Sequence, residues 1–195
     1  MAHDAPLVIQ ITDARALDEA SLFARIDAAA ALGSRYAVML RDPELVPREL
    51  LAKGRALRDR LRHGGARLLV NDRLDLAQAL SADGVHLGRL SVAPSRARAL
   101  LGEGVLVTVS AHDVDEAVAR AASGALAVLL SPIFVSPGKG PALGLEALAR
   151  ARRRLPPEVA LIALGGVDAE NAYDCLAAGA DGVASVRAEL HRLFA

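Results

Sequence analysis

The sequence has one cysteine and no excess of either charge, and both shortages exclude classes of function. With Cys175 alone, the 195-residue chain can form neither an intramolecular disulfide framework nor a cysteine-based metal cluster. Because 23 lysines and arginines balance 23 aspartates and glutamates, the electrostatic footprint of a nucleic-acid binder is missing. Residues 1–6 do not form a signal peptide, and no apolar run reaches membrane-spanning length. We therefore expect a cytoplasmic protein with no nucleic-acid or membrane partner.

Aromatic residues are scarce as well, with two tyrosines, three phenylalanines and no tryptophan. Alanine supplies much of the 53% hydrophobic content, a composition that favours helices packed closely on strands. The length suits one domain with a sizeable core, so we expect residues 1–195 to form a single domain.

Short apolar runs alternate with longer amphipathic stretches along the whole chain. The expected strands are Leu7–Ile11, Tyr36–Leu40, Arg67–Val70, Gly84–Leu87, Val105–Val109, Leu126–Leu130, Ala160–Leu164 and Gly182–Val186. The expected helices are Glu19–Leu32, Pro47–His63, Leu74–Leu80, Pro94–Leu101, Val114–Ala122, Leu145–Leu155, Ala169–Ala178 and Arg187–Leu193. Continuously apolar strands of this length are typical of a parallel sheet buried on both faces.

Eight successive strand–helix units predict an α/β protein with a single (β/α)8 TIM barrel. Pro47 and Pro94 suit the first turn of a helix, where a missing N–H costs nothing. The alternative is an open, doubly wound sheet, which usually has a glycine-rich GxGxxG turn after its first strand. Residues 11–14 contain no glycine, so the barrel is favoured.

In such a barrel the catalytic groups lie on the loops that follow the strands, and nearly every expected strand here ends in polar residues. Gly165 and Gly166, with Ser185 after the last strand, have the position of a barrel phosphate site. The alternative is a tight turn that needs glycine for its backbone alone. Lys139, in the loop that starts at Ser136, could supply a point charge for a phosphate or could be an ordinary surface lysine.

Two more strand ends carry candidate residues, each with an alternative interpretation. Asp72, after Asn71, could hold Mg²⁺ through water, pair with Arg41, or cap the next helix. His112, two residues after Ser110, could act as a general acid or base, or simply begin a helix.

The remaining histidines and the cysteine have simpler interpretations. His86 lies within a strand and is expected to be a core histidine or one that supports a neighbouring site residue. Surface positions are expected for His3, His63 and His191, and a packing role for Cys175.

The chain resembles the thiamine phosphate synthase and TenI (thiazole tautomerase) superfamily along nearly its whole length. The matching segments, in family order, are residues 11–13 (ITD), 69–73 (LVNDR), 82–88 (ADGVHLG), 109–112 (VSAH), 131–134 (SPIF), 163–167 (ALGGV) and 178–184 (AGADGVA). The resemblance implies a barrel that acts on thiazole phosphate. In the synthase branch, hydroxymethylpyrimidine diphosphate loses diphosphate with the help of Mg²⁺, and the thiazole nitrogen captures the cation.

The resemblance also implies roles for individual residues. Asp72 would be the magnesium ligand, while Arg41, Asn71, Ser110, Ser136 and Lys139 would contact the pyrimidine diphosphate. Gly165, Gly166 and Ser185 would hold the thiazole phosphate. In the TenI branch, which needs no cofactor, the histidine that matches His112 moves a proton to give the aromatic thiazole.

The chain departs from the synthase pattern at positions that matter for diphosphate departure. The expected Gln-Leu-Arg-Glu-Lys reads Met39-Leu40-Arg41-Asp42-Pro43, so a lysine is missing. The second magnesium carboxylate is replaced by Ser91, and Arg89 cannot substitute for it as a metal ligand. Losing one contact to a developing charge costs about a hundredfold in rate.

These departures favour a TenI-like thiazole tautomerase that works by proton transfer, with His112 and Ser110 as catalytic residues. The first alternative is an Mg²⁺-dependent thiamine phosphate synthase with an altered site. The second is a non-catalytic sensor of a phosphorylated ligand. The partner in each case is a small phosphorylated thiazole or pyrimidine, and a homodimer is the assembly we considered.

Overall fold

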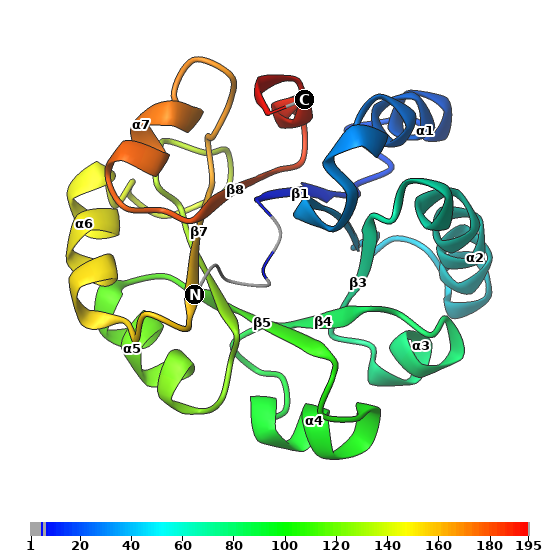
Figure 1. The fold of residues 1–195 in the computed structure, drawn as a ribbon, viewed down its shortest axis with the longest axis horizontal. Helices are drawn as coiled ribbons and strands as arrows, with labels where there is room; N and C mark the ends of the chain where they lie inside the picture. Colours follow the sequence, from blue (N-terminus) through cyan, green and yellow to red (C-terminus); the bar gives the residue numbers. More distant parts are fainter. Residues whose placement is uncertain (1–4, 6, 195) are drawn as a thin grey trace.

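The computed structural model describes residues 5 and 7–194, which form a closed barrel of eight parallel strands in chain order (Figure 1). The strands are β1 Val8–Ile11, β2 Tyr36–Leu40, β3 Arg67–Asn71, β4 Gly84–Leu87, β5 Leu106–Ala111, β6 Ala127–Leu130, β7 Ala160–Leu164 and β8 Gly182–Ser185. The α-helices are α1 Glu19–Ala28, α2 Pro47–Gly64, α3 Leu74–Ala79, α4 Pro94–Leu101, α5 Val114–Ala122, α6 Leu145–Arg154 and α7 Ala172–Ala177, with 3₁₀ turns η1 Ala30–Arg35 and η2 Leu190–Leu193. The predicted TIM barrel is confirmed.

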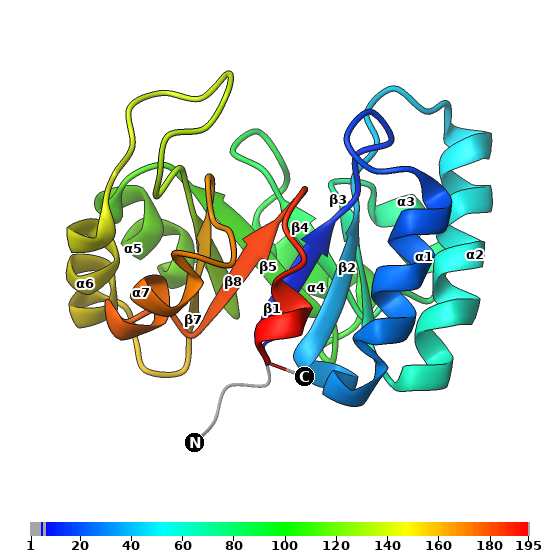
Figure 2. The same cartoon turned by 90° about the horizontal axis from the view of Figure 1, so that it is seen from above.

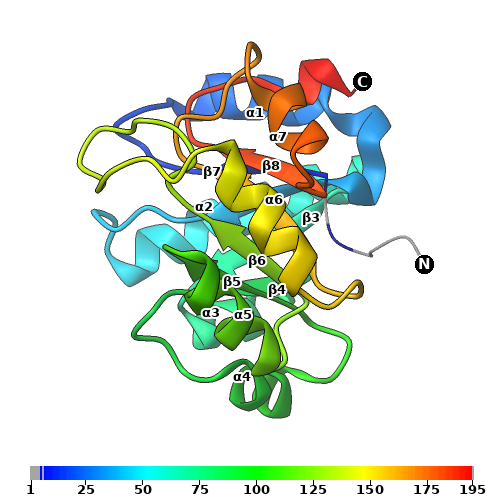
Figure 3. The ribbon, with the colours of Figure 1, turned by 90° about the vertical axis from the view of Figure 1, so that its left-hand side faces the viewer.

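The polar strand ends gather at one end of the barrel, which positions the candidate site. All strands run in the same direction, so the loops that follow them lie together at the top of Figure 2. The loop between β6 and α6 projects far above the strands there. In the side view of Figure 3, α6 and α7 lie next to each other on the outside of the barrel.

Two apolar layers hold the strands in place. Inside the barrel, alternate strand residues such as Ile9, Met39, Leu129 and Ile162 pack against one another. The other face of each strand packs against the helices. Because both faces of each strand are covered, its inward-facing and outward-facing residues are mostly apolar. This explains why the strands are continuous apolar runs in the sequence. Among the described residues, no helix is long and apolar enough to cross a membrane.

The helix predicted over Arg187–Leu193 is wrong, because only the 3₁₀ turn η2 forms there. The hydroxyl of Ser185 accepts hydrogen bonds from the N–H groups of Arg187 and Ala188, at 3.2 and 2.9 Å. The Arg187 carbonyl accepts a hydrogen bond from Arg25 at 2.8 Å rather than from the N–H four residues on, as it would in an α-helix. Similarly, α7 starts at Ala172 instead of Ala169, because the preceding residues form a turn around the Asp168 carboxylate.

The helix predicted over Glu19–Leu32 is divided into α1, which ends at Ala28, and η1, which itself contains a kink at Gly33 with φ 53° and ψ −133°. His191, predicted at the surface, is only 2% exposed, because η2 folds back against β1 and β8. Its ring meets that of Tyr36 edge-on, with centroids 6.3 Å apart. His63 is exposed as predicted, Cys175 is buried as predicted, and His3 lies outside the described residues.

The repeated Ala-Asp-Gly-Val motif builds the opposite end of the barrel. Asp83 and Asp181 precede β4 and β8, and each carboxylate accepts the N–H of a residue in the strand before it. An arginine completes each arrangement: Arg58 from α2 bonds Asp83, and Arg152 from α6 bonds Asp181. The same arrangement of an aspartate, an arginine and a strand N–H therefore occurs in both halves of the barrel. These aspartates lie far from the strand exits.

Candidate active site

The exits of β2 and β3 bring three predicted site residues next to each other. Leu40 pairs with Val70, so Arg41 and Asn71 leave neighbouring strands at the same level. The Arg41 N–H donates to Thr12 Oγ1 at 2.8 Å, and its side chain is exposed to solvent. Asp72 follows Asn71 directly. The predicted cluster of Arg41, Asn71 and Asp72 thus forms on one side of the barrel mouth.

Asp42 is a site-building residue that the sequence analysis did not single out. The residue is 3% exposed, and its carboxylate accepts the Thr12 hydroxyl and the Ala14 N–H, each at 2.6 Å. The Nζ of Lys53, from α2, lies 2.8 Å from Asp42 Oδ2. One carboxylate therefore ties the exits of β1 and β2 to α2 and fixes the backbone beside Arg41. No motif or spacing in the sequence indicates that Lys53, eleven positions along the chain, reaches this carboxylate.

Asp72 occupies a strained backbone position at the β3 exit. Its φ is 63°, which a non-glycine residue seldom adopts, and its N–H donates to the His86 carbonyl at 2.9 Å. The N-cap of α3 is Arg73, without a capping side chain, so Asp72 does not cap this helix. In the described part of the chain Asp72 makes no ion pair with Arg41 either. Instead, the Ser91 hydroxyl donates to Asp72 Oδ1.

The donor atoms around Asp72 limit how a magnesium ion can bind there. No group of three or more histidine, cysteine, aspartate or glutamate side chains able to hold a metal occurs among the described residues. Mg²⁺, however, is commonly held by one or two carboxylates together with waters and substrate phosphates. Asp72, with the Ser91 oxygen beside it, fits that donor set only when a phosphorylated substrate completes it.

His86 lies between two hydroxyl groups at the wall of the barrel. Its Nδ1 is 2.9 Å from Thr108 Oγ1, and its Nε2 is 2.8 Å from Ser110 Oγ. Burial lowers the pKa of His86 to about 4, so the ring is neutral at neutral pH. The expectation that His86 supports a neighbouring residue is confirmed, and the residue it contacts is the predicted site residue Ser110.

His112 lies at the exit of β5, as predicted. Its Nδ1 is 3.1 Å from the Ser131 carbonyl oxygen, which can only accept, so this nitrogen carries a proton. The ring is exposed, and the backbone N–H donates to the Glu116 carboxylate at 2.8 Å. The N-cap of α5 is the next residue, Asp113. An anchored, solvent-facing imidazole of this kind can exchange a proton with a bound ligand.

Gly165 and Gly166 both have left-handed backbone conformations, with φ 92° and 67°. A Cβ on Gly166 would lie 2.7 Å from Phe134 Cβ, and one on Gly165 would lie 2.7 Å from Pro132 Cα. The segment after β6 therefore packs directly against this turn. The N–H groups of Gly166 and Val167 donate to no other described residue. Consecutive N–H groups of this kind can bind an anion.

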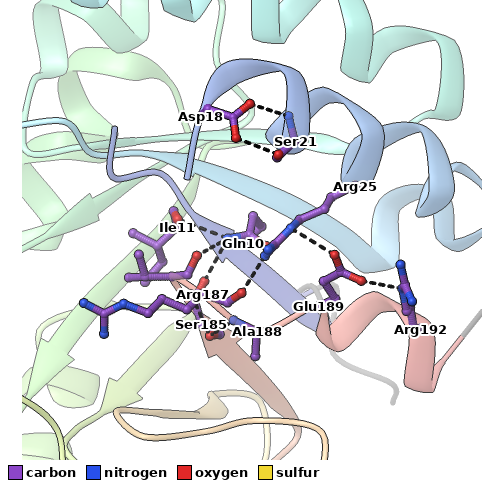
Figure 4. A network of polar contacts seen from close by, with 11 residues as sticks. Gln10, Ile11, Asp18, Ser21, Arg25, Ser185, Arg187, Ala188, Glu189 and Arg192 are labelled. Atoms are coloured by element: carbon purple, nitrogen blue, oxygen red, sulfur yellow. Dashed lines mark hydrogen bonds and ion pairs between the residues drawn. The ribbon is translucent and has the colours of Figure 1, made fainter. Parts of the chain in front are cut away.

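Ser185 is less accessible than the sequence suggests. Its side chain is 8% exposed, and its hydroxyl accepts the two N–H groups of the turn that follows. Figure 4 shows this turn held further by Arg25, whose guanidinium donates to the Arg187 carbonyl at 2.8 Å. Gln10 donates to the Val186 carbonyl at 2.8 Å from the neighbouring strand. The Ser185 hydroxyl thus shapes the β8 exit by holding the backbone of the turn that follows it.

Ser136 and Lys139 lie on the long loop above the barrel. The Lys139 N–H donates to the Ser136 carbonyl at 3.2 Å and closes a turn. Lys139 is exposed, and its ammonium makes no ion pair within the described residues. The loop therefore carries a mobile cation on the same end of the barrel as Asp72 and His112.

A profile of the family described as thiamine monophosphate synthase matches residues 8–188. The chain belongs to this family. The family expected from the sequence is therefore confirmed, and its members are enzymes of thiamine biosynthesis.

Individual relatives agree with this assignment. The chain is 43% identical over 162 residues to the thiamine-phosphate synthase of Methanoculleus marisnigri, covering 82% of this chain and 76% of that one. It is 37% identical over 185 residues to the thiamine-phosphate synthase of a Roseiflexus species, covering 93% and 77%. Thiamine phosphate pyrophosphorylase from Pyrococcus furiosus superposes with a TM-score of 0.80 and 27% identity, covering 95% and 87%.

Proposed function

We propose that this protein is an Mg²⁺-dependent thiamine phosphate synthase. Relatives with this name are 37–43% identical to the chain, which supports the alternative in our sequence analysis over the tautomerase that we favoured there. The observation that carries the proposal is the position of Asp72 beside Ser91, at the same barrel end as Arg41, Asn71 and Lys139.

In the proposed reaction, the bond between the pyrimidine methylene carbon and the diphosphate oxygen breaks, and its electron pair leaves with diphosphate. The lone pair of the thiazole nitrogen then forms the new carbon–nitrogen bond. Negative charge builds up on the departing diphosphate, and fixed donors and cations at that place lower the barrier. Arg41 and Lys139 supply the positive charges, and Asn71 and Ser110 supply neutral donors.

Asp72 would hold Mg²⁺, with Ser91 as a neutral neighbour, and the ion would neutralise charge on the diphosphate when bound. With a single carboxylate, the site depends on diphosphate oxygens to complete the coordination. We therefore expect Mg²⁺ and the diphosphate substrate to bind more tightly together than separately. Lys53 does not replace the missing lysine of the family pattern, because the buried Asp42 already pairs with it.

The thiazole phosphate would bind at the Gly165–Gly166 turn. Its N–H groups can donate hydrogen bonds to a phosphate oxygen without a side-chain charge. Because Ser185 uses its hydroxyl within its own turn, its contribution would be to hold the β8 exit in place.

The test is a chromatographic assay for thiamine phosphate with hydroxymethylpyrimidine diphosphate, thiazole phosphate and Mg²⁺. We expect multiple turnovers with wild type and a loss of about a hundredfold or more in kcat for Asp72→Ala. Asp75→Ala is the control, since this exposed aspartate of α3 pairs with Arg73 on the surface. Absence of product, beside an active synthase from another source, would overturn the proposal.

The tautomerase remains the second candidate, because His112 is anchored by Ser131 and exposed at the site. Conversion of the thiazole carboxylate phosphate, lost in His112→Ala, would favour it. Thermal stabilisation by thiazole phosphate with no turnover in either assay would favour the sensor.

A further inference from the structure

The buried His86 is a part of the site that the proposed reaction does not yet use. It connects two hydroxyls, Thr108 behind it and Ser110 at the exit of β5. The ring and Thr108 are buried, whereas Ser110 is half-buried. Because a neutral imidazole has one donor and one acceptor nitrogen, the three side chains form a hydrogen-bonded row with a definite direction.

The far end of this row fixes its direction in the structure without ligand. Thr108 Oγ1 donates to the Val85 carbonyl at 3.3 Å, so its oxygen accepts the proton of His86 Nδ1. The neutral ring then has Nε2 as its acceptor, and the Ser110 hydroxyl donates to it. In this arrangement Ser110 points its only proton at His86 and has none to offer a ligand.

We propose that His86 is a positioning residue that changes tautomer when a diphosphate group binds beside Ser110. This inference rests on the proposed function. In the bound arrangement, His86 Nε2–H donates to Ser110, the Ser110 hydroxyl donates to a diphosphate oxygen, and the Thr108 hydroxyl turns from Val85 to donate to Nδ1. The ring releases its Nδ1 proton to water and takes up one at Nε2, so its charge does not change.

A diphosphate selects this arrangement because, once ionised, its oxygens can only accept hydrogen bonds. The unliganded direction of the row would set Ser110 lone pairs against phosphate oxygens, whereas the reversed direction gives three successive donor–acceptor contacts. Successive hydrogen bonds polarise one another, so the donation from His86 strengthens the one from Ser110. The row therefore favours ligands that only accept hydrogen bonds over ligands that donate.

The direct test is NMR of the side-chain nitrogens in uniformly ¹⁵N-labelled protein, in which histidine rings and asparagine amides are both observed, titrated with inorganic diphosphate and Mg²⁺. Protonated and unprotonated ring nitrogens of a neutral histidine give well-separated signals, and the His86 signals are assigned by their loss in His86→Gln. We expect Nδ1 to be protonated without diphosphate and Nε2 to be protonated with it.

Each result of this titration has a definite meaning. If the signals of the Asn71 side-chain amide shift while the His86 tautomer stays the same, diphosphate binds without the tautomer change. That result would overturn this inference but not the proposed function. No shift of any signal up to millimolar diphosphate would overturn both the inference and the proposed function. A row that already has Nε2 protonated without ligand would also overturn the tautomer change.

A double-mutant cycle tests whether His86 acts through Ser110. We expect His86→Leu and Ser110→Ala each to lower kcat/KM for the diphosphate substrate by about tenfold to a hundredfold, and the double variant to fall no further than Ser110→Ala. If the loss of kcat/KM in the double variant equals the product of the two single losses, the inference is overturned. His86→Gln can donate its amide N–H to Ser110, so it should recover most of the activity lost in His86→Leu. His191→Leu, at a second buried histidine outside the site, is the control for kcat/KM, and thermal melting checks the folding of each variant.

Discussion

The Nζ of Lys53 lies 2.8 Å from Oδ2 of Asp42, and both side chains are almost fully removed from solvent, with 11% and 1% of their surfaces exposed. The pair connects α2 to the strand exits, because the same carboxylate also accepts the Thr12 hydroxyl and the Ala14 N–H. A buried carboxylate with three donors around it is a rigid support for the backbone of Arg41, its neighbour in the chain.

Removing one member of this pair should therefore be costly. We expect Lys53→Met to lower the free energy of unfolding by about 3–5 kcal/mol, because it leaves the Asp42 carboxylate buried without its cation. Urea denaturation measures this change. Arg15→Ala is the control: Arg15 pairs with Asp13 at the surface, with 64% of its side chain exposed, and its loss should cost at most about 1 kcal/mol. A similar small cost for Lys53→Met would contradict a structural role for the pair.

The contact between Ser91 and Asp72 leads to a prediction about gain of metal affinity. Ser91→Asp places a second carboxylate next to Asp72, and each added carboxylate strengthens the binding of a hard divalent cation. We expect the Mg²⁺ concentration for half-maximal thiamine phosphate formation to fall by about tenfold, with a rise in kcat. Ser95→Asp, in the exposed first turn of α4, adds the same charge away from the site and is the control. If Ser91→Asp and Ser95→Asp lower this Mg²⁺ concentration equally, the gain comes from net charge and not from a second ligand beside Asp72.

Two glycines with different surroundings test the phosphate turn. Gly166→Ala adds a Cβ 2.8 Å from the Val135 carbonyl oxygen at a residue whose φ is 67°, so the turn must shift. Gly140 has no atom within 4 Å of an added Cβ and lies on the loop above the barrel. We expect Gly166→Ala to raise KM for thiazole phosphate at least tenfold, and Gly140→Ala to change it little. Steady-state kinetics with the thiazole phosphate varied provide the measurement, and equal KM values would refute the assignment of this turn.

The sequence predicted the barrel well because its buried strands show a strong local signal. Continuous apolar runs such as Tyr36–Leu40 and Ala160–Leu164 have the observed boundaries, since both faces of these strands are covered. The error at Arg187–Leu193 has a tertiary cause. The carbonyl of Arg187 accepts a hydrogen bond from the distant Arg25 and not from the N–H four residues on, as an α-helix would require.

The candidate site was predicted as a set of strand ends, but its internal contacts were not. Asn71, Asp72 and His112 lie where the pattern put them, because the end of a parallel strand fixes which end of the barrel a residue occupies. The contacts of Lys53 with Asp42, and of His86 with Ser110, join residues from different strand–helix units. Such pairings depend on the directions in which side chains point across the barrel. The hydrophobic periodicity of the sequence does not predict these directions.

His191 predicts how stability changes with pH. Burial is the main cause that lowers the pKa of His191 below the usual 6.5, and Arg192 and Arg25 add to it against the opposing effect of Glu189. The unfolded chain therefore binds a proton near pH 6.5, whereas the folded chain binds it only at lower pH. Stability from the neutral ring is complete above pH 6.5 and is lost as the pH falls through 6.5 toward the lowered value.

Replacing this ring removes one titrating group while keeping its contact with Tyr36. We expect the free energy of unfolding of His191→Phe to fall less steeply between pH 7 and about pH 5 than that of wild type. The remaining slope would come from His86, whose pKa is lowered to about 4 in the same direction. Urea denaturation at several pH values gives the slopes, with His63→Ala as a control that removes an exposed histidine. If His63→Ala flattens the profile as much as His191→Phe, the buried ring is not the source of the pH dependence.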